Sequence, residues 1–159
     1  MRTRIISAFP GTGKTYYHKM NPETTLDSDS SNFSWLEAPA GGLVRNPEFP
    51  NNYIQHIKEN IGMYEIIFVS SHEEVRKALI ENCIFFYLLY PNVTEKEAYI
   101  QRYKERGSSD EFINLISENW EKWLKQLGYC TVGCKNLKLE MPIEKEIQYL
   151  IKWENRDRS

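Results

Sequence analysis

The residues best suited to chemistry lie near the start of the chain, in the segment Ala8-Phe9-Pro10-Gly11-Thr12-Gly13-Lys14-Thr15. This segment follows a short apolar run and precedes a stretch that can be helical, which is the context that a Walker A phosphate loop requires. Small residues let successive backbone N–H groups converge on phosphate oxygens, and the start of the following helix adds further donors. We expect Lys14 to reach the β- and γ-phosphates of a nucleotide and the hydroxyl of Thr15 to ligate Mg²⁺.

One position departs from the usual pattern, because Ala8 stands where the first glycine is expected. Alanine is the smallest substitute and the position ends the first predicted strand, so we expect the loop to tolerate it. A glycine turn that happens to precede Lys-Thr is the alternative interpretation. The residues predicted to contact the nucleotide are Pro10, Gly11, Thr12, Gly13, Lys14, Thr15 and Tyr16.

Two carboxylates follow the second predicted strand, which covers residues 24–26. Asp27 and Asp29 are separated by one residue, so in an extended segment both side chains point the same way. The carboxyl ends of strands in an open α/β sheet are where ligands bind. We therefore predict that both contact substrate, and that Asp29 also holds Mg²⁺ through water or acts as a base toward a hydroxyl. A solvated turn is the alternative.

The third predicted strand covers residues 64–69 and ends at Ser70, where many phosphate-loop proteins carry an acid that helps to hold Mg²⁺. Serine brings no negative charge, so that role would pass to one of the two preceding carboxylates, or to Thr15 with waters. His72 and Arg76 begin the next predicted helix. We expect both to contact the substrate or its phosphate.

A pair of arginines one helical turn apart, Arg102 and Arg106, precedes a Gly-Ser-Ser break at residues 107–109. This arrangement predicts a short helical lid over residues 99–112, whose closure would bring positive charge to a transferring phosphoryl group and exclude water. The alternative is a solvated basic face paired with glutamates of the same helix.

Residues 32–52 lack regular periodicity, and we expect them to be irregular. Long excursions of this kind are functional or disordered. Arg45 is the one cation of the excursion, and an acceptor that carries a phosphate needs such a group. Phe33, Trp35 and Tyr53 could sandwich a base, although simple packing of the excursion explains them equally well. We assign residues 30–62 as the acceptor-binding region.

Strands alternate with helices along the chain, which predicts one α/β domain over residues 1–159: a five-stranded, mostly parallel sheet with helices on both faces. The predicted strands cover residues 4–8, 24–26, 64–69, 83–90 and 135–139. The predicted helices cover residues 14–20, 52–60, 110–127 and 143–153, with one further helix capped by Ser71 and another capped by Thr94 in a capping box with Glu97.

The composition bounds the function. The chain has 159 residues, 41% hydrophobic and 26% charged, with a formal net charge of −2. These values are ordinary for a globular protein and argue against a surface that coats nucleic acid. No apolar run approaches the roughly 20 residues of a membrane span, and we expect no signal peptide. Three irregularly spaced cysteines favour reduced thiols and a cytoplasmic location. We expect a monomer or a homodimer.

The pattern resembles the P-loop nucleoside monophosphate kinases, and more closely the small, adenylate-kinase-like nucleotide kinases of bacteriophages. The segments that carry the resemblance are Phe9 to Thr15, Asp27 to Ser31, Arg45 to Pro47 and Val69 to His72. The resemblance implies a P-loop NTPase fold with strand order 2-3-1-4-5. It also implies that Lys14, Arg102 and Arg106 stabilise the transferred phosphoryl group, and that Arg45 and Arg76 hold the acceptor phosphate. Unlike adenylate kinases, the chain has no Asp-Gly after the third strand and no zinc cysteines in the lid.

We therefore expect a Mg²⁺-dependent phosphotransferase that uses ATP as donor and a (deoxy)nucleoside monophosphate as acceptor. Two alternatives stay open. A kinase of another hydroxyl, on a nucleoside, a sugar or a modified base in DNA, would use Asp27 or Asp29 as its base. A nucleotide-binding module that hydrolyses ATP slowly and acts on a partner protein would be consistent with the missing acid at Ser70.

Overall fold

The computed structural model describes residues 1–130 and 132–157. Its centre is a sheet of five strands in which each neighbouring pair is parallel. The strands are β1 (Arg4–Ala8), β2 (Thr25–Asp27), β5 (Ile66–Ser70), β6 (Phe86–Pro91) and β7 (Cys134–Leu139), in the order β2-β5-β1-β6-β7. If only the five strands of this sheet are numbered along the chain, their spatial order is 2-3-1-4-5. The labels skip two numbers because a separate hairpin, β3–β4, lies between β2 and β5.

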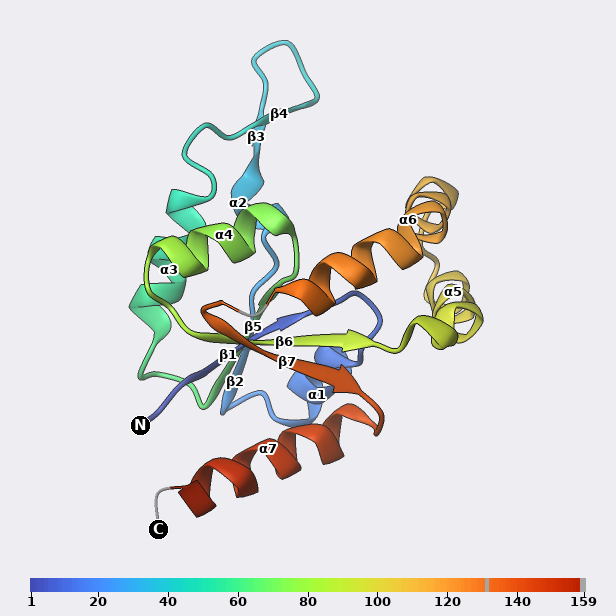
Figure 1. Cartoon of the computed structure of the whole chain (residues 1–159). Coiled ribbons are helices and arrows are strands. Elements are labelled where there is room, and N and C mark those ends of the chain that lie inside the picture. The colour runs from blue at the N-terminus through green and yellow to red at the C-terminus, as the bar shows by residue number, and fades with distance from the viewer. Residues whose placement is uncertain (131, 158–159) are drawn as a thin grey trace.

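Helices cover both faces of the sheet, which confirms the predicted α/β class (Figure 1). The helices are α1 (Lys14–Met20), α3 (Asn51–Asn60), α4 (Glu73–Glu81), α5 (Lys96–Glu105), α6 (Asp110–Tyr129) and α7 (Ile143–Asp157). The larger core contains α3, α4, α5 and α6, and the smaller core contains α7 with Tyr17 of α1. No helix within the described residues is long and apolar enough to cross a membrane.

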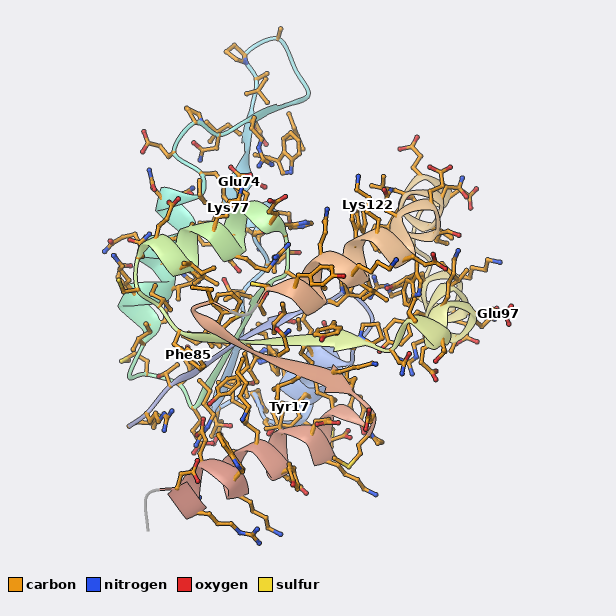
Figure 2. All side chains as sticks on the ribbon, in the orientation of Figure 1. Tyr17, Glu74, Lys77, Phe85, Glu97 and Lys122 are labelled. Atoms are coloured by element: carbon orange, nitrogen blue, oxygen red, sulfur yellow. The ribbon has the colours of Figure 1, made fainter. Side chains whose placement is uncertain are left out.

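The central strands are apolar at successive positions because both of their faces are buried. In β5, Ile67 and Val69 belong to the larger core, whereas Ile66 and Phe68 belong to the smaller one. Successive side chains of a strand point to opposite faces, so one continuous apolar run supplies both cores. Figure 2 shows Tyr17 on the side of the sheet that α7 covers.

The prediction that residues 32–52 are irregular was wrong. The segment contains the short helix α2 (Ser31–Ser34) and an antiparallel hairpin of β3 (Trp35–Glu37) and β4 (Leu43–Arg45). Gly41 and Gly42, with φ of 93° and 77°, form the turn that joins these strands. The hairpin projects away from the body of the protein (Figure 1), and all six of its strand residues are exposed, so no buried face imposes the alternation that reveals a strand.

Two predicted helix caps were also wrong. The Asn92 side chain, not Thr94, acts as the cap: it accepts a hydrogen bond of 3.2 Å from the backbone N–H of Thr94, and one 3-10 turn then leads into α5. At α4 the N-cap position is His72 rather than Ser71, and its side chain makes no capping hydrogen bond. The first shift comes from local hydrogen bonding at the end of β6, where an asparagine side chain competes well for a free N–H.

Helix α7 is tied to the sheet by a buried ionic contact. Glu154 is 4% exposed; its Oε2 accepts a 2.6 Å hydrogen bond from Nε of Arg4 on β1, and its Oε1 accepts one from the Tyr87 hydroxyl on β6. Burial alone would raise the pKa of this carboxyl, but the bonds from Tyr87 and Arg4 outweigh it and hold the pKa below 4.5. The last helix therefore depends on a charge whose partners lie on β1, near the start of the sequence, and on β6, near its middle.

Glu154→Gln keeps the shape of the side chain but leaves Arg4 without its counter-charge. We expect the free energy of unfolding to fall by about 3 kcal/mol, as when one partner of a buried pair is removed. Because the folded-state pKa is depressed, the wild-type advantage is present at neutral pH and disappears as the pH falls below 4.5. Urea unfolding at several pH values measures this. Glu118→Gln on the exposed face of α6 is the control, and an equal effect of both changes would contradict the assignment.

Candidate phosphate-binding site

The phosphate loop leaves the sheet at Ala8 and enters α1 at Lys14. Ala8 is buried and paired with Ser70 and Leu89 in neighbouring strands, so this position needs no glycine. The unusual backbone lies further on, where Gly11 and Gly13 have φ of 84° and 99°. L-residues with side chains adopt these angles only with strain, so the two glycines of the motif stand where the backbone requires them.

Helix α5 presses directly on the loop. A Cβ atom added at Gly11 would lie 2.9 Å from Cε1 of Tyr103. The Tyr103 hydroxyl donates a 2.7 Å hydrogen bond to the carbonyl of Pro10, and Nη1 of Arg102 donates one of 2.8 Å to the carbonyl of Gly11. The Thr12 hydroxyl donates to the carbonyl of Phe9 at 2.9 Å. These contacts hold the loop carbonyls and so fix the direction in which its N–H groups can point.

A cleft of about 690 Å³ opens over the loop, and we call it the phosphate cleft. It brings together most of the predicted residues, drawn from four separate parts of the chain: Pro10, Gly11, Gly13, Lys14, Thr15, Tyr16, Asp29, His72, Arg102 and Arg106. The predicted residues that do not line it are Thr12, Asp27, Trp35, Arg45 and Arg76. Three of its lining side chains, those of Lys14, Arg102 and Arg106, carry cationic ends of the kind that pairs with phosphate oxygens.

The chemistry at the loop end suits a magnesium ion. The Thr15 hydroxyl lies 3.2 Å from Oδ2 of Asp27, so a hydroxyl and a carboxylate already face each other. Mg²⁺ is commonly held by one or two such oxygens, with waters and substrate phosphates completing the octahedron. No group of three His, Cys, Asp or Glu residues within the described chain could hold a metal.

Asp29 was predicted to be the metal-binding carboxylate, but Asp27 is the one that contacts Thr15. Asp29 is exposed in the cleft, and its Oδ1 accepts a 2.9 Å hydrogen bond from the backbone N–H of Ser31 at the start of α2. The two side chains diverge because the strand ends at Asp27, so the extended alternation on which the prediction relied stops there. Asp29 therefore combines a turn contact with a free carboxylate edge toward the cleft.

The two arginines of the predicted lid stack on aromatic rings. The Arg102 guanidinium lies 4.5 Å from the centroid of Tyr99, and that of Arg106 lies 4.9 Å from Tyr103 and 5.7 Å from Phe112. Both rings of α5 are buried against the core, at 4% and 0% exposure. Helix α5 is thus anchored, and movement of a lid would be confined to the exposed arginine ends and the turn at residues 107–109.

Arg45 and Trp35, the predicted acceptor contacts in the excursion, form a surface cluster. Nη2 of Arg45 lies 2.5 Å from Oε2 of Glu74, and its guanidinium covers the rings of Trp35 at 5.5 Å and Phe49 at 4.9 Å. Figure 2 shows Glu74 on α4 near the base of the hairpin. In this structure Arg45 ties the hairpin to α4 and does not line the phosphate cleft.

His72 lies at the junction of β5 and α4 and lines the cleft. Loss of hydration lowers the pKa of its imidazole, Lys14 and Arg45 lower it further, and Asp29 opposes them. The lowered pKa favours the neutral imidazole, which suits a hydrogen-bonding contact better than a charged one.

A buried hydroxyl network beneath the cleft was not foreseen from the sequence. The Tyr53 hydroxyl donates a 2.6 Å hydrogen bond to the carbonyl of Ser28 and accepts one of 3.3 Å from the N–H of Ser70. Ser70 Oγ in turn accepts from the N–H of Ser30 at 3.2 Å. Burial raises the pKa of Tyr53 to about 12, so it stays protonated. Ser70 thus joins β5 to the carboxylate segment. The sequence offered Tyr53 either for stacking on a base or for packing the excursion, and the structure buries it completely.

Two smaller cavities adjoin the phosphate cleft. The side pocket, about 330 Å³, shares Pro10, Ser71, His72 and Phe112 with it. The outer cleft, about 540 Å³, shares Arg102 with it and meets the loop at Thr12. The outer cleft is also lined by the end of β6, by Glu95 and Tyr99, and by residues 139–143, which run from the end of β7 to the start of α7. The phosphate cleft therefore has one neighbouring cavity at Pro10 and another at Arg102.

Comparison with known proteins gives no match: no protein-family model matches the chain, and no curated protein matches it. The interpretation of the site therefore depends on the positions of its own residues. The most informative arrangement is the positive-φ loop, which ends at Lys14 and Thr15 and shares one cleft with the two arginines of α5.

Gly11→Ala tests whether the packing of α5 on the loop matters. The added Cβ meets Tyr103 and suffers a strained backbone, so we expect stability to fall by about 2 kcal/mol and ATP affinity to fall roughly tenfold as the loop shifts. Gly41→Ala is the matched control, since Gly41 also has positive φ but nothing within 4 Å of the added atom. Thermal unfolding and calorimetric ATP titration measure both effects. A loss of ATP affinity in Gly41→Ala as large as in Gly11→Ala would refute the role of the contact.

Proposed function

We propose that this protein is a P-loop phosphotransferase that moves the γ-phosphoryl group of ATP to a (deoxy)nucleoside monophosphate. The observation that supports this most is the phosphate cleft, in which Lys14, Arg102 and Arg106 surround one space above a glycine loop. Two adjoining cavities support a reaction of two substrates, because a nucleotide that is only hydrolysed needs room for one base.

In the proposed reaction an oxygen of the acceptor phosphate forms a bond to the γ-phosphorus, and the bond from that phosphorus to the β,γ-bridging oxygen breaks. The electron pair leaves with ADP, and the product is a nucleoside diphosphate. Such transfer depends on positioning and on neutralisation of charge rather than on covalent chemistry by the protein. Lys14 would contact the β- and γ-phosphates, and Arg102 and Arg106 would stabilise charge on the transferring group.

Mg²⁺ would neutralise phosphate charge when bound, and Thr15 with Asp27 would hold it, directly or through water. The donor base would lie in the outer cleft, because Arg102 lines both that cavity and the phosphate cleft. The aromatic stacking of Arg102 on Tyr99 preorganises its guanidinium at this boundary. His72, at the opposite boundary, would donate or accept a neutral hydrogen bond to the acceptor.

The proposal is tested by incubating the protein with Mg-ATP and each common NMP and dNMP, with ADP and product mass as readouts. We expect transfer to one or two acceptors, and a fall of about 10²-fold or more in Lys14→Ala. Lys19→Ala, on the exposed side of the same helix, is the control and should retain full rate. ADP formed at one slow rate with every acceptor and with none would contradict the proposal and favour a partner-regulating ATPase.

A kinase of a hydroxyl group is the second candidate, because Asp29 presents a carboxylate edge to the cleft. Asp29→Asn separates the two reactions: asparagine can still accept the bond from Ser31, so only the charge is lost. A hydroxyl acceptor needs a base, and its kcat would fall about 10²–10⁴-fold. A phosphate acceptor needs none, so we expect less than a roughly tenfold loss. Asp110→Asn, at the start of α6, is the control, and steady-state kinetics give the result.

A further inference from the structure

The side pocket lies between α4 and α6, next to the phosphate cleft. Its walls are mainly apolar and include Phe9, Phe112, Leu115 and the half-buried ring of Trp123. Its volume of about 330 Å³ falls within the range of cavities that bind small ligands, ~300–1,000 Å³. Such a slot suits a flat, largely apolar group rather than a second charged one.

The polar groups of the pocket are concentrated on a few side chains. Arg76 lines it, and only its Nε is used within the described protein, in a 2.9 Å hydrogen bond to the carbonyl of Ser71. No carboxylate among the described residues forms an ion pair with Arg76. Gln126, which carries an amide donor and an acceptor, also lines the pocket. Arg76 is half-buried, and its remaining guanidinium N–H groups are available to acceptor atoms on whatever binds there.

We propose that the side pocket holds the base of the acceptor nucleotide, and that Arg76 selects a base with a carbonyl edge: guanine, thymine or uracil. This inference rests on the proposed function. An arginine fork donates well to the O6 and N7 atoms of guanine and to the carbonyl oxygens of thymine or uracil. Adenine presents an amino donor at the corresponding position, which would face the donors of Arg76 and leave them unpaired.

The path between base and phosphate is also short. Pro10, Ser71, His72 and Phe112 border both the side pocket and the phosphate cleft, so a sugar could cross there from one cavity to the other. The excursion lacks this continuity, since neither Arg45 nor Trp35 lines either cavity. The acceptor base is thereby assigned to the groove of α4 and α6 and not to the hairpin.

Calorimetric titration of dGMP, dTMP and dAMP without ATP tests the proposal directly. We expect dGMP or dTMP to bind roughly tenfold or more tightly than dAMP. Arg76→Met should abolish that preference, whereas Lys77→Met should keep it. Lys77 is an exposed neighbour on α4 that does not itself line the pocket (Figure 2), and its replacement removes the same charge and releases its ion-pair partner Glu73, which does line the pocket. A preference kept in Lys77→Met therefore shows that neither the lost charge nor the released carboxylate sets it.

A second pair of variants tests the apolar body of the pocket and does not depend on Arg76. Leu115→Arg adds bulk and charge at the pocket rim, and we expect it to weaken dGMP and dTMP binding about tenfold. Asn114→Arg makes the same addition at an exposed neighbour that lies outside the pocket, and should bind like the wild type. Unfolding midpoints of all four variants show which of them fold.

The assignment is overturned if the wild type binds none of these nucleotides, if dAMP binds as tightly as the other two, or if Leu115→Arg binds like Asn114→Arg. Turnover of the same variants separates the two proposals. Binding that depends on Leu115 without phosphoryl transfer retains the side pocket and rejects the kinase. Transfer to dGMP or dTMP with an unchanged KM in Leu115→Arg retains the kinase and rejects the side pocket.

Discussion

The packing of helix α5 on the phosphate loop is the contact on which the site depends. Gly11 leaves room for the ring of Tyr103, and the hydroxyl of that ring holds the carbonyl of Pro10. The same helix carries Arg102 and Arg106 over the cleft. One contact thus sets both the conformation of the loop and the position of the charges above it. A change that displaces α5 from the loop would therefore also displace both arginines.

The sheet supplies the second requirement, which is to bring distant segments to one edge. The phosphate loop, the carboxylates and the end of β5 all leave the sheet at the carboxyl ends of parallel strands. The hydroxyl network of Tyr53 and Ser70 binds these ends together below the cleft. Ser70 has a structural role at a position where an acid would be expected, and the carboxylate beside Thr15 comes instead from Asp27.

The hairpin of the excursion lies outside the cavities that adjoin the phosphate cleft. The hairpin of β3 and β4 is held to α4 through Arg45 and Glu74. Its exposed apolar side chains do not line the side pocket. Helices α4 and α6 form the wall beside the phosphate cleft, and Arg76, which the sequence offered as a substrate contact, lies in that wall. Donor and acceptor would then occupy opposite neighbours of the loop, with Arg102 at one boundary and His72 at the other.

The sequence by itself determined the α/β class and the position of the positive-φ glycine loop between β1 and α1, because glycine spacing and continuous apolar strands are local signals. It also identified Asp29, His72 and the two arginines as residues of one cleft. Only the tertiary structure decided that Asp27 faces Thr15, that Arg45 pairs with Glu74, and that a pocket lies between α4 and α6. Those outcomes depend on which side chains of distant elements come into contact. A pattern within a single segment carries no information about such contacts.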